Sequence, residues 1–255
     1  MTLTRLIRPN RPTLAVNATA GDGPVMVFFP GYASDMSGSK AQALRDYAVS
    51  TGRACLLFDY AGCGESAGHF ADETLESWRD DVLDVIAAHA ADRSLILIGS
   101  SMGGWLMVLV ALELARNDPA RIAGLIGIAA APDFTDWGYT AEQKAILMRD
   151  GRLFVDNPYG PEPTLTTHAL WLSGEANRLL DSAIPLTCPV RLLHGQADAD
   201  VPFMISLRLA EQLRSAEVVI TLVKDGDHRL SRPQDIALLV GTVDALHATL
   251  EGQTA

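Results

Sequence analysis

The sequence predicts an α/β fold with a mostly parallel central sheet, helices on both faces of that sheet and a small helical cap. Short runs of branched apolar residues alternate with helical patterns along most of the chain, as in sheets that are covered on both sides. One of these runs leads into Gly99-x-Ser101-x-Gly103, a pattern typical of a strand, a sharp turn and a helix. The 255 residues are 48% hydrophobic, which is enough for one large domain.

The turn at Ser101 has the features of a nucleophile elbow. A turn this tight needs small residues two positions before and after the serine, and Gly99 and Gly103 stand there. Taking Ser100 as the apex would put isoleucine and methionine in the crowded positions. Residues 105–114 are almost wholly apolar and predict a buried central helix whose amino end lies beneath the serine. Ser101 is therefore the candidate nucleophile.

The elements before this turn begin with residues 5–11, which predict an edge element, and continue with a buried strand over 25–29. A loop over 31–38, a helix over 39–51 and a second strand over 54–58 follow. In serine hydrolases of this organisation, the backbone N–H just after the first glycine of that loop helps to form the oxyanion hole, together with the N–H after the nucleophile. The predicted oxyanion pair is the Tyr32 and Met102 amides, and the alternative is a plain strand-to-helix turn.

A glycine-rich segment after the second strand has the spacing of a dinucleotide-binding motif. Gly62-x-Gly64-x-x-Ala67 matches the dinucleotide fingerprint. Gly68 and His69 come before the next helix, however, whereas the cofactor motif opens its helix directly. The three cysteines lack the paired spacing of a zinc site. We therefore expect no organic cofactor and no metal.

The charge and the cysteines restrict the partners and the compartment. The formal net charge of -11 argues against nucleic acid and against an anionic membrane surface. Six carboxylates between Asp72 and Asp84 predict the solvated face of an amphipathic helix. No apolar run approaches the roughly 20 residues of a membrane span. Three widely spaced cysteines make a disulfide framework improbable, so we expect a reducing, cytoplasmic location.

The strand pattern continues over residues 123–130 and then stops. Residues 132–186 show no strand alternation, contain several prolines and have two short helical patterns, over 141–149 and 166–180. We expect this segment to be a cap inserted in a core of residues 1–131 and 187–255. The aromatic residues of the cap either cover an apolar pocket or pack the cap onto the core. They are Phe134, Trp137, Tyr139, Phe154, Tyr159 and Trp171.

Regular elements return after the cap with a strand over 189–194, a helix over 203–214, a strand over 218–222 and a last helix from Pro233. Two polar residues follow these strands, Asp198 and His228. Chemistry in such sheets takes place at the carboxyl ends of the strands. A serine hydroxyl needs an imidazole to take its proton, and the imidazole needs a carboxylate to fix its tautomer. Ser101, Asp198 and His228 are therefore the predicted triad.

Other residues could have filled two of these roles. Asp200 and Asp133 are rival acids. His194 precedes a glycine at the end of a strand, which is more typical of a structural hydrogen bonder than of a catalytic base.

These motifs resemble those of the α/β-hydrolase family over nearly the whole length of the chain. The order of serine, acid and histidine is the family's order. His194-Gly-x-x-Asp198-x-x-Val201-Pro202 resembles its acid loop, and Asp59-x-x-Gly-x-Gly-x-Ser66 resembles the loop after its fourth core strand.

Narrower matches resemble the mitochondrial palmitoyl-protein thioesterases of the abhydrolase-domain group, which also act as acyl-glucuronide esterases. The matching segments are Pro30-Gly31-Tyr32-x-Ser34-x-Met36-x-Gly38-x-Lys40-Ala41, Gly99-Ser-Ser-Met-Gly-Gly-Trp-Leu-Met107, Arg191-Leu-Leu-His-Gly195 and Asp227-His228-Arg229. The resemblance implies acyl transfer to water from thioesters or activated oxyesters. The cap shows no comparable agreement and a full transit peptide is missing, so we expect a bacterial cytoplasmic relative.

The sequence thus predicts a serine esterase or thioesterase that forms an acyl-enzyme with a small-molecule or acylated substrate. One alternative is a different bond on the same scaffold, as in carbon–carbon hydrolases, epoxide hydrolases or perhydrolases. Epoxide and haloalkane hydrolases of this fold use an aspartate nucleophile, which Ser101 argues against. Another alternative is a non-catalytic binding protein on the same fold. The pattern makes no prediction of oligomeric state.

Overall fold

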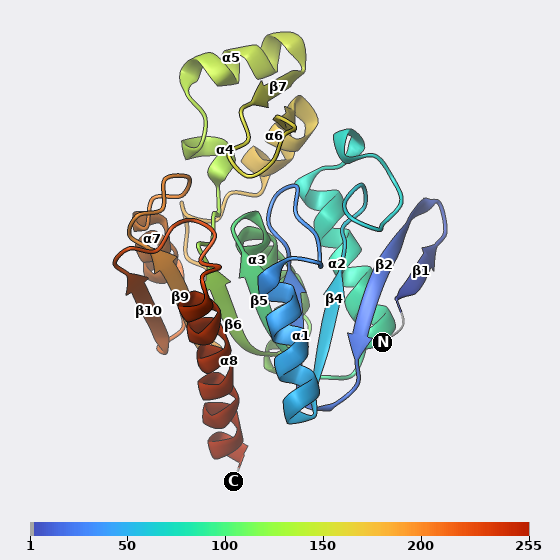
Figure 1. Ribbon diagram of the computed structural model, residues 1–255, viewed down its shortest axis with the longest axis vertical. Coiled ribbons are helices and arrows are strands. Elements are labelled where there is room, and N and C mark those ends of the chain that lie inside the picture. Colours follow the sequence, from blue (N-terminus) through green and yellow to red (C-terminus); the bar gives the residue numbers. More distant parts are fainter. Residues whose placement is uncertain (1–2, 255) are drawn as a thin grey trace.

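A computed structural model describes residues 3–254, and an eight-stranded sheet runs through its centre (Figure 1). The order across the sheet is β1-β2-β4-β3-β5-β6-β9-β10. The first two strands pair antiparallel and the other six run parallel, which confirms the predicted mostly parallel sheet. The strands are β1 (Thr4–Arg8), β2 (Arg11–Thr19), β3 (Asp22–Phe29), β4 (Arg53–Phe58), β5 (Leu95–Ser100), β6 (Ile122–Ile128), β9 (Val190–Gly195) and β10 (Val218–Val223).

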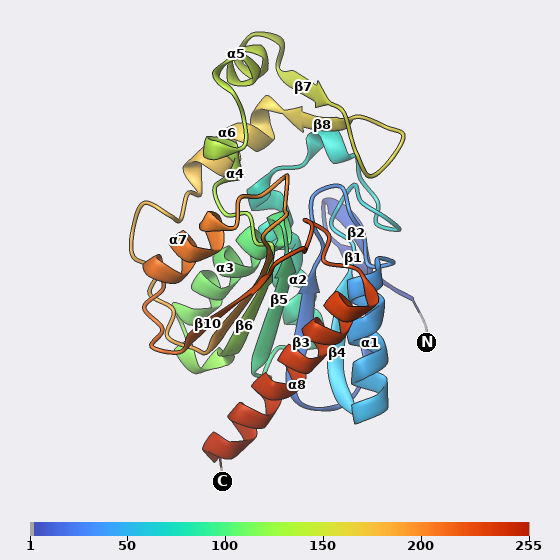
Figure 2. The same cartoon turned by 60° about the vertical axis from the view of Figure 1, so that its left-hand side comes forward.

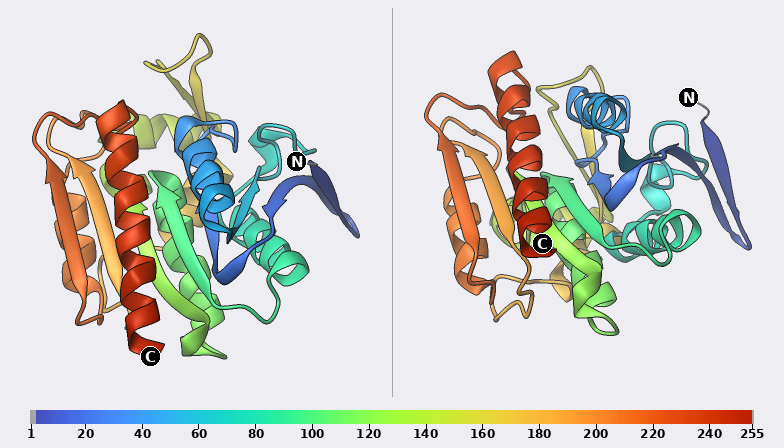
Figure 3. Two further views of the ribbon diagram at one scale, coloured as in Figure 1. Left: turned by 60° about the horizontal axis from the view of Figure 1, so that its bottom comes forward. Right: turned by 90° about the horizontal axis from the view of Figure 1, so that it is seen from below.

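Helices cover both faces of this sheet, as Figures 2 and 3 show. One face carries α1 (Ser39–Thr51) and α8 (Pro233–Thr254), and the other carries α2 (Leu75–His89), α3 (Met102–Ala115) and α7 (Met204–Gln212). Side chains of a strand alternate between the two faces, so Leu97 packs in one core and Ile98 in the other. Short 3₁₀ turns at Phe70–Asp72 and Pro119–Arg121 complete this part of the chain.

The amino-terminal edge contains more structure than the sequence predicted. The expected edge element at residues 5–11 is a hairpin of β1 and β2, and Arg8 in it reaches across to α2. Its guanidinium lies 2.5 Å from the Asp81 carboxylate, whose side chain is 1% exposed. The prediction that all the carboxylates of this segment face solvent is therefore wrong for Asp81 and for Glu73, which are both buried. A pattern of polar and apolar positions does not reveal a cation supplied from another element.

Residues 132–186 form a group of short elements beyond one end of the sheet (Figure 1). They are α4 (Phe134–Trp137), α5 (Ala141–Asp150), β7 (Arg152–Val155), β8 (Thr164–Thr167) and α6 (His168–Ala176). Helices were expected over 141–149 and 166–180, where α5 and the shorter α6 lie, but α4 and the antiparallel pair β7–β8 were not expected. Its strands have only four residues each, and one of them reads Thr-Leu-Thr-Thr, so neither makes an apolar run. Treating this insertion as a cap on a separate core stays a prediction.

The described helices and the three cysteines bear on two further predictions. Among residues 3–254, no helix is long and apolar enough to cross a membrane. Cys55, Cys63 and Cys188 are free, so the prediction that they form no disulfide framework is confirmed. Burial raises the pKa of the Cys55 and Cys63 thiols to about 12. These cysteines therefore act as small apolar side chains.

Candidate active site

Ser101 stands at the apex of a strained turn between β5 and α3. Its backbone has φ 56° and ψ -123°, which is unusual for a residue with a side chain. A Cβ on Gly99 would lie 2.3 Å from the Gly103 carbonyl oxygen, and one on Gly103 would lie 2.2 Å from the Phe29 carbonyl oxygen. Both positions therefore require glycine, for the reason that the pattern suggested. Ser101, and not Ser100, holds the apex.

The structure brings the three predicted triad residues together from three separate strand ends. His228 Nε2 lies 3.0 Å from Ser101 Oγ, and His228 Nδ1 lies 2.9 Å from Asp198 Oδ2. Ser101 follows β5, Asp198 follows β9 and His228 follows β10. The parallel strands all end on the same side of the sheet, so residues far apart in the chain meet there. This arrangement can pass a proton from a serine hydroxyl to an imidazole.

The Asp198 carboxylate is wholly buried and heavily hydrogen-bonded. Oδ1 accepts the backbone N–H groups of Asp200 at 2.9 Å and Val201 at 2.8 Å. Oδ2 lies 2.9 Å from His228 and also 3.2 Å from His194 Nε2. Burial alone would raise the pKa of Asp198, but hydrogen bonds from both histidines and from the Val201 backbone hold it well below its usual range. The carboxylate is therefore ionised at neutral pH.

The rival residues have other partners. Asp133 accepts the backbone N–H groups of Leu179 and Leu180, each at 2.8 Å, and so fixes the return of the insertion to the sheet. The Asp200 carboxylate accepts a hydrogen bond from the Tyr159 hydroxyl. Ligand atoms of Asp198, Asp200 and His228 lie within 4.8 Å of one another and could hold a cation, although all three residues already have protein partners. The expectation of a metal-free protein stays a prediction.

The predicted oxyanion loop passes directly beside the serine. A Cβ on Gly31 would lie 3.4 Å from the Ser101 Cβ, so the chain just before Tyr32 passes close to Ser101. The Asp59 carboxylate supports this loop, since it accepts the Met36 N–H at 2.7 Å. Met102 is the first residue of α3, where backbone N–H groups lack partners within the helix. The assignment of the Tyr32 and Met102 amides to the oxyanion hole stays a prediction.

The glycine-rich loop after β4 is built around a carboxylate. The second oxygen of Asp59 accepts the Glu65 N–H at 2.8 Å. A Cβ on Gly64 would lie 2.2 Å from Asp59 Oδ2, so this glycine allows the loop to fold over the acid. Asp59 thus holds this loop as well as the oxyanion loop, and the expectation of no organic cofactor stays a prediction.

A cavity of about 640 Å³ opens at Ser101 and His228. Its walls come from the oxyanion loop, from the start of α1 and from residues 155–160 of the insertion. Two cationic side chains, Lys40 and Arg229, line it. Burial and the nearby Arg229 lower the pKa of Lys40 to about 8. Polar groups thus form much of the wall around the serine.

The aromatic residues of the insertion have two different roles. Of the six aromatic residues of the insertion, only Tyr159 is among the described residues that line the cavity. Its ring lies 6.5 Å from the His228 ring, and the Arg229 guanidinium lies 5.5 Å from the Tyr159 ring centre. Trp137 and Trp171 instead donate their indole N–H groups to the Pro132 and Thr135 carbonyls. Packing of the insertion therefore explains most of these aromatics.

Sequence reasoning missed two neighbours of the site. Tyr159 lies in a proline-rich stretch whose pattern contains no signal for its position. His194 was expected to make structural hydrogen bonds, and it does, with Ser206 and Val201, but its proximity to Asp198 was not foreseen. The signal for this proximity was the position of His194 only four residues before Asp198 in the sequence.

Comparison with known proteins finds hydrolases that are similar in sequence and in fold. A family model described as the alpha/beta hydrolase fold matches residues 24–182. The human mitochondrial palmitoyl-protein thioesterase ABHD10 is 39% identical over 248 residues, which are 96% of this chain and 79% of the relative. The mouse protein of the same name is 41% identical over 249 residues, which are 96% of this chain and 82% of that protein.

Two solved structures are similar over nearly their full lengths. The mouse alpha/beta hydrolase domain-containing protein 10 has a TM-score of 0.89 and 38% identity, covering 98% of this chain and all of the other. A putative hydrolase from Agrobacterium vitis S4 has a TM-score of 0.89 and 37% identity, covering 96% of this chain and 97% of the other. The mitochondrial label belongs to the named relatives, and a cytoplasmic location for this chain stays a prediction.

Proposed function

This chain belongs to the α/β-hydrolase fold family, and from that premise we propose that it is a serine esterase or thioesterase with Ser101 as its nucleophile. The observation that carries the proposal is the continuous chain of contacts from Ser101 Oγ to His228 at 3.0 Å and on to Asp198 at 2.9 Å. A serine hydroxyl near its ordinary pKa is a poor nucleophile, and this pairing supplies the base that it needs.

The reaction proceeds in two steps. His228 Nε2 takes the hydroxyl proton of Ser101 as the oxygen attacks the carbonyl carbon of the substrate. The imidazolium then gives that proton to the leaving alcohol or thiol, and an acyl-enzyme remains. Water attacks the acyl carbon as His228 removes its proton, the bond to Ser101 Oγ breaks, and His228 returns the proton to Oγ while the acyl group leaves as a carboxylic acid. Asp198 holds the imidazole in the correct tautomer and stabilises its positive charge.

The negative charge that forms on the carbonyl oxygen needs donors that are already in place. The backbone amides of Tyr32 and Met102 are the proposed donors, because one lies in the loop against the serine and the other at the amino end of α3. Both are backbone groups, so a side-chain substitution does not remove them.

The cavity suggests which esters fit. Lys40 and Arg229 lie on its wall, which favours a substrate with a polar or anionic group away from the reacting carbonyl. The names of the relatives favour a thioester. We therefore expect acyl-CoA and acyl-glucuronide substrates to be cleaved with a higher kcat/KM than a neutral nitrophenyl ester of the same acyl chain. Equal kcat/KM values for charged and neutral leaving groups would argue against this substrate class.

Substitution of Ser101 tests the nucleophile. Ser101→Ala should lower kcat by about a thousandfold or more and abolish labelling by a fluorophosphonate probe, because it removes only the attacking oxygen. Ser100→Ala is the matched control, and it should label and turn over within a few-fold of the wild type. Thermal unfolding of both variants checks that the fold is intact.

The opposite pattern, with labelling lost only in the Ser100 variant, would overturn the assignment. A wild-type protein that folds but is never labelled would favour a binding protein on this fold. Labelling without hydrolysis of any ester or thioester would favour chemistry on a different bond.

A further inference from the structure

The catalytic acid has a second histidine beside it. His194 is the second-last residue of β9 and is wholly buried, with an exposed fraction of 0%. Its Nε2 lies 3.2 Å from the same oxygen of Asp198, Oδ2, that contacts His228. Oδ2 therefore lies between two imidazole rings, one of which reaches the nucleophile.

The neighbours of His194 fix which ring nitrogen carries a proton. Nε2 lies 3.0 Å from the Val201 carbonyl oxygen, and a carbonyl oxygen can only accept. Nε2 must therefore carry a hydrogen, which it donates to Val201 O, and Asp198 Oδ2 lies 3.2 Å from the same nitrogen. On the other side of the ring, the Ser206 hydroxyl lies 2.7 Å from Nδ1 and can donate to it.

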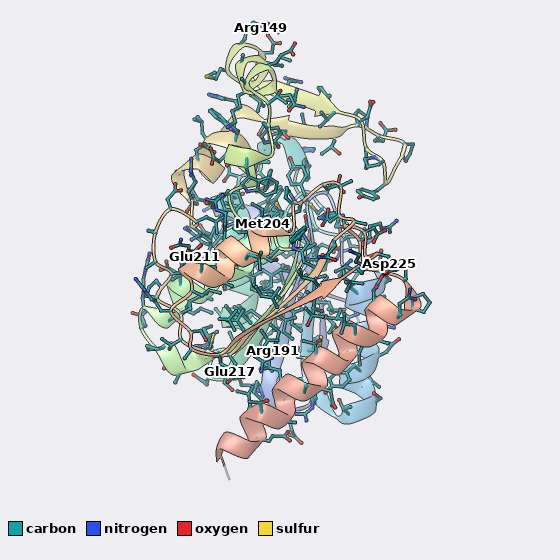
Figure 4. The ribbon with its side chains drawn as sticks, turned by 90° about the vertical axis from the view of Figure 1, so that its left-hand side faces the viewer. Arg149, Arg191, Met204, Glu211, Glu217 and Asp225 are labelled. Atoms are coloured by element: carbon teal, nitrogen blue, oxygen red, sulfur yellow. The ribbon has the colours of Figure 1, made fainter. Side chains whose placement is uncertain are left out.

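The element that holds the ring is rigid. Ser206 is 1% exposed and lies on α7, whose amino end is marked by Met204 in Figure 4. The ring is thus held between a strand end and a helix, and it cannot turn without breaking a buried hydrogen bond.

Other titratable groups near Asp198 are His228, Asp200 and Tyr159.

We propose that His194 is a positioning residue for catalysis, which holds the Asp198 carboxylate in the orientation that His228 needs through its Nε2–H group. The proposal rests on the function proposed above. Without this N–H group, Asp198 Oδ2 would keep only His228 as a side-chain partner, and the carboxylate would have more freedom to turn about the backbone donors that hold Oδ1.

Two variants of His194 separate positioning from packing. His194→Phe keeps a buried ring but removes the N–H group, whereas His194→Gln can place an amide N–H near the position of Nε2. We expect His194→Phe to lower kcat by about tenfold or more with KM within about twofold, and His194→Gln to recover most of that loss. Rates are divided by the concentration of active sites titrated with the fluorophosphonate probe, so partial unfolding does not count as lost turnover.

The pH profile gives a second readout. With the carboxylate freer to turn, Oδ2 faces His228 for less of the time and stabilises the imidazolium less. The acid limb of kcat/KM should therefore move downward by about half a pH unit in His194→Phe. Leu192→Ala, on the same strand and equally buried, is the control: it should lower Tm and leave the acid limb in place.

A double-mutant cycle with Asp198→Asn decides whether His194 acts through the acid. We expect His194→Phe to cost less than threefold in kcat when Asp198 is already Asn, because the carboxylate that it positions is gone. If His194→Phe lowers only Tm, or if its effect multiplies with that of Asp198→Asn, the proposal fails. A wild-type protein that the probe never labels would refute the proposed function instead, so the two failures are distinguishable.

Discussion

At the scale of single residues, the site separates two aspartates that lie two positions apart. The Asp198 carboxylate faces His228, whereas the Asp200 carboxylate accepts the Tyr159 hydroxyl. The backbone produces this separation, because the N–H of Asp200 itself donates to Asp198 Oδ1 and turns the second side chain outward.

Asp198→Asn should therefore lower kcat by about a hundredfold or more with the fold intact, because an amide cannot stabilise the imidazolium as a carboxylate does. Asp200→Asn is the matched control, with an expected loss of less than about fivefold. Steady-state kinetics on one ester would measure both. Equal large losses would mean that the triad acid is not Asp198 alone.

At the scale of elements, the pair β7–β8 brings the insertion to His228. Residues 155–160, which begin at the last residue of β7, line the cavity, and Tyr159 joins them to the acid loop through Asp200. The hydroxyl contact and the Arg229 guanidinium over the Tyr159 ring hold this loop at the wall of the cavity.

Tyr159→Phe removes the hydroxyl and keeps the ring. We expect KM to rise about threefold with kcat nearly unchanged, since the loop shapes the binding cavity and takes no part in bond breaking. Amide hydrogen exchange over residues 156–163 should become faster. Phe154→Ala changes an exposed aromatic of β7 outside the cavity lining and should leave KM unaltered. If Tyr159→Phe has the KM and the amide exchange rates of the wild type, the hydrogen bond from Tyr159 to Asp200 does not hold the loop in place.

At the scale of the whole molecule, a buried ion pair holds the sheet edge that β1 forms. This edge is four strands away from β5, which carries the elbow. Arg8 of β1 donates to Asp81 of α2 at 2.5 Å and to the Pro12 carbonyl, while Asp81 Oδ2 accepts the Ala61 N–H at 2.8 Å. Burial raises the pKa of Asp81 above its usual value, against the lowering effect of Ala61 and Arg8. The pair joins the amino-terminal hairpin to the helical layer.

Arg8→Met should lower the free energy of unfolding by about 3 kcal/mol at about pH 8, because it leaves a buried carboxylate without its main cation. The folded-state pKa of Asp81 then rises further above the unfolded value, so the folded protein binds a proton more readily as pH falls. The loss should therefore be smaller at about pH 5 than at about pH 8. Urea unfolding at both pH values measures it.

Arg5→Met, on the same strand, breaks an exposed pair with Glu65 and should change stability by less than about 0.5 kcal/mol. Neither variant should alter kcat/KM, since neither residue lines the cavity at Ser101 and His228. A pH-independent loss in Arg8→Met would mean that Asp81 does not carry the charge in the folded protein.

Much of this protein follows from local patterns in its sequence. The apolar runs predict the parallel strands, and the two glycines around Ser101 predict the elbow because the turn leaves no room for a Cβ at either position. The order of Ser101, Asp198 and His228 predicts their meeting, because all three follow parallel strands that end on one side of the sheet.

Contacts between segments far apart in the chain depended on the tertiary structure. The four-residue strands of β7–β8 pair with each other and make no apolar run of their own, so the path of Tyr159 to the site carries no local signal. The burial of Asp81 depends on Arg8, 73 residues away, and a carboxylate looks the same in sequence whether or not a cation reaches it. Periodicity reports how a segment packs, whereas the partner of a buried polar group is decided by which segments the fold brings together.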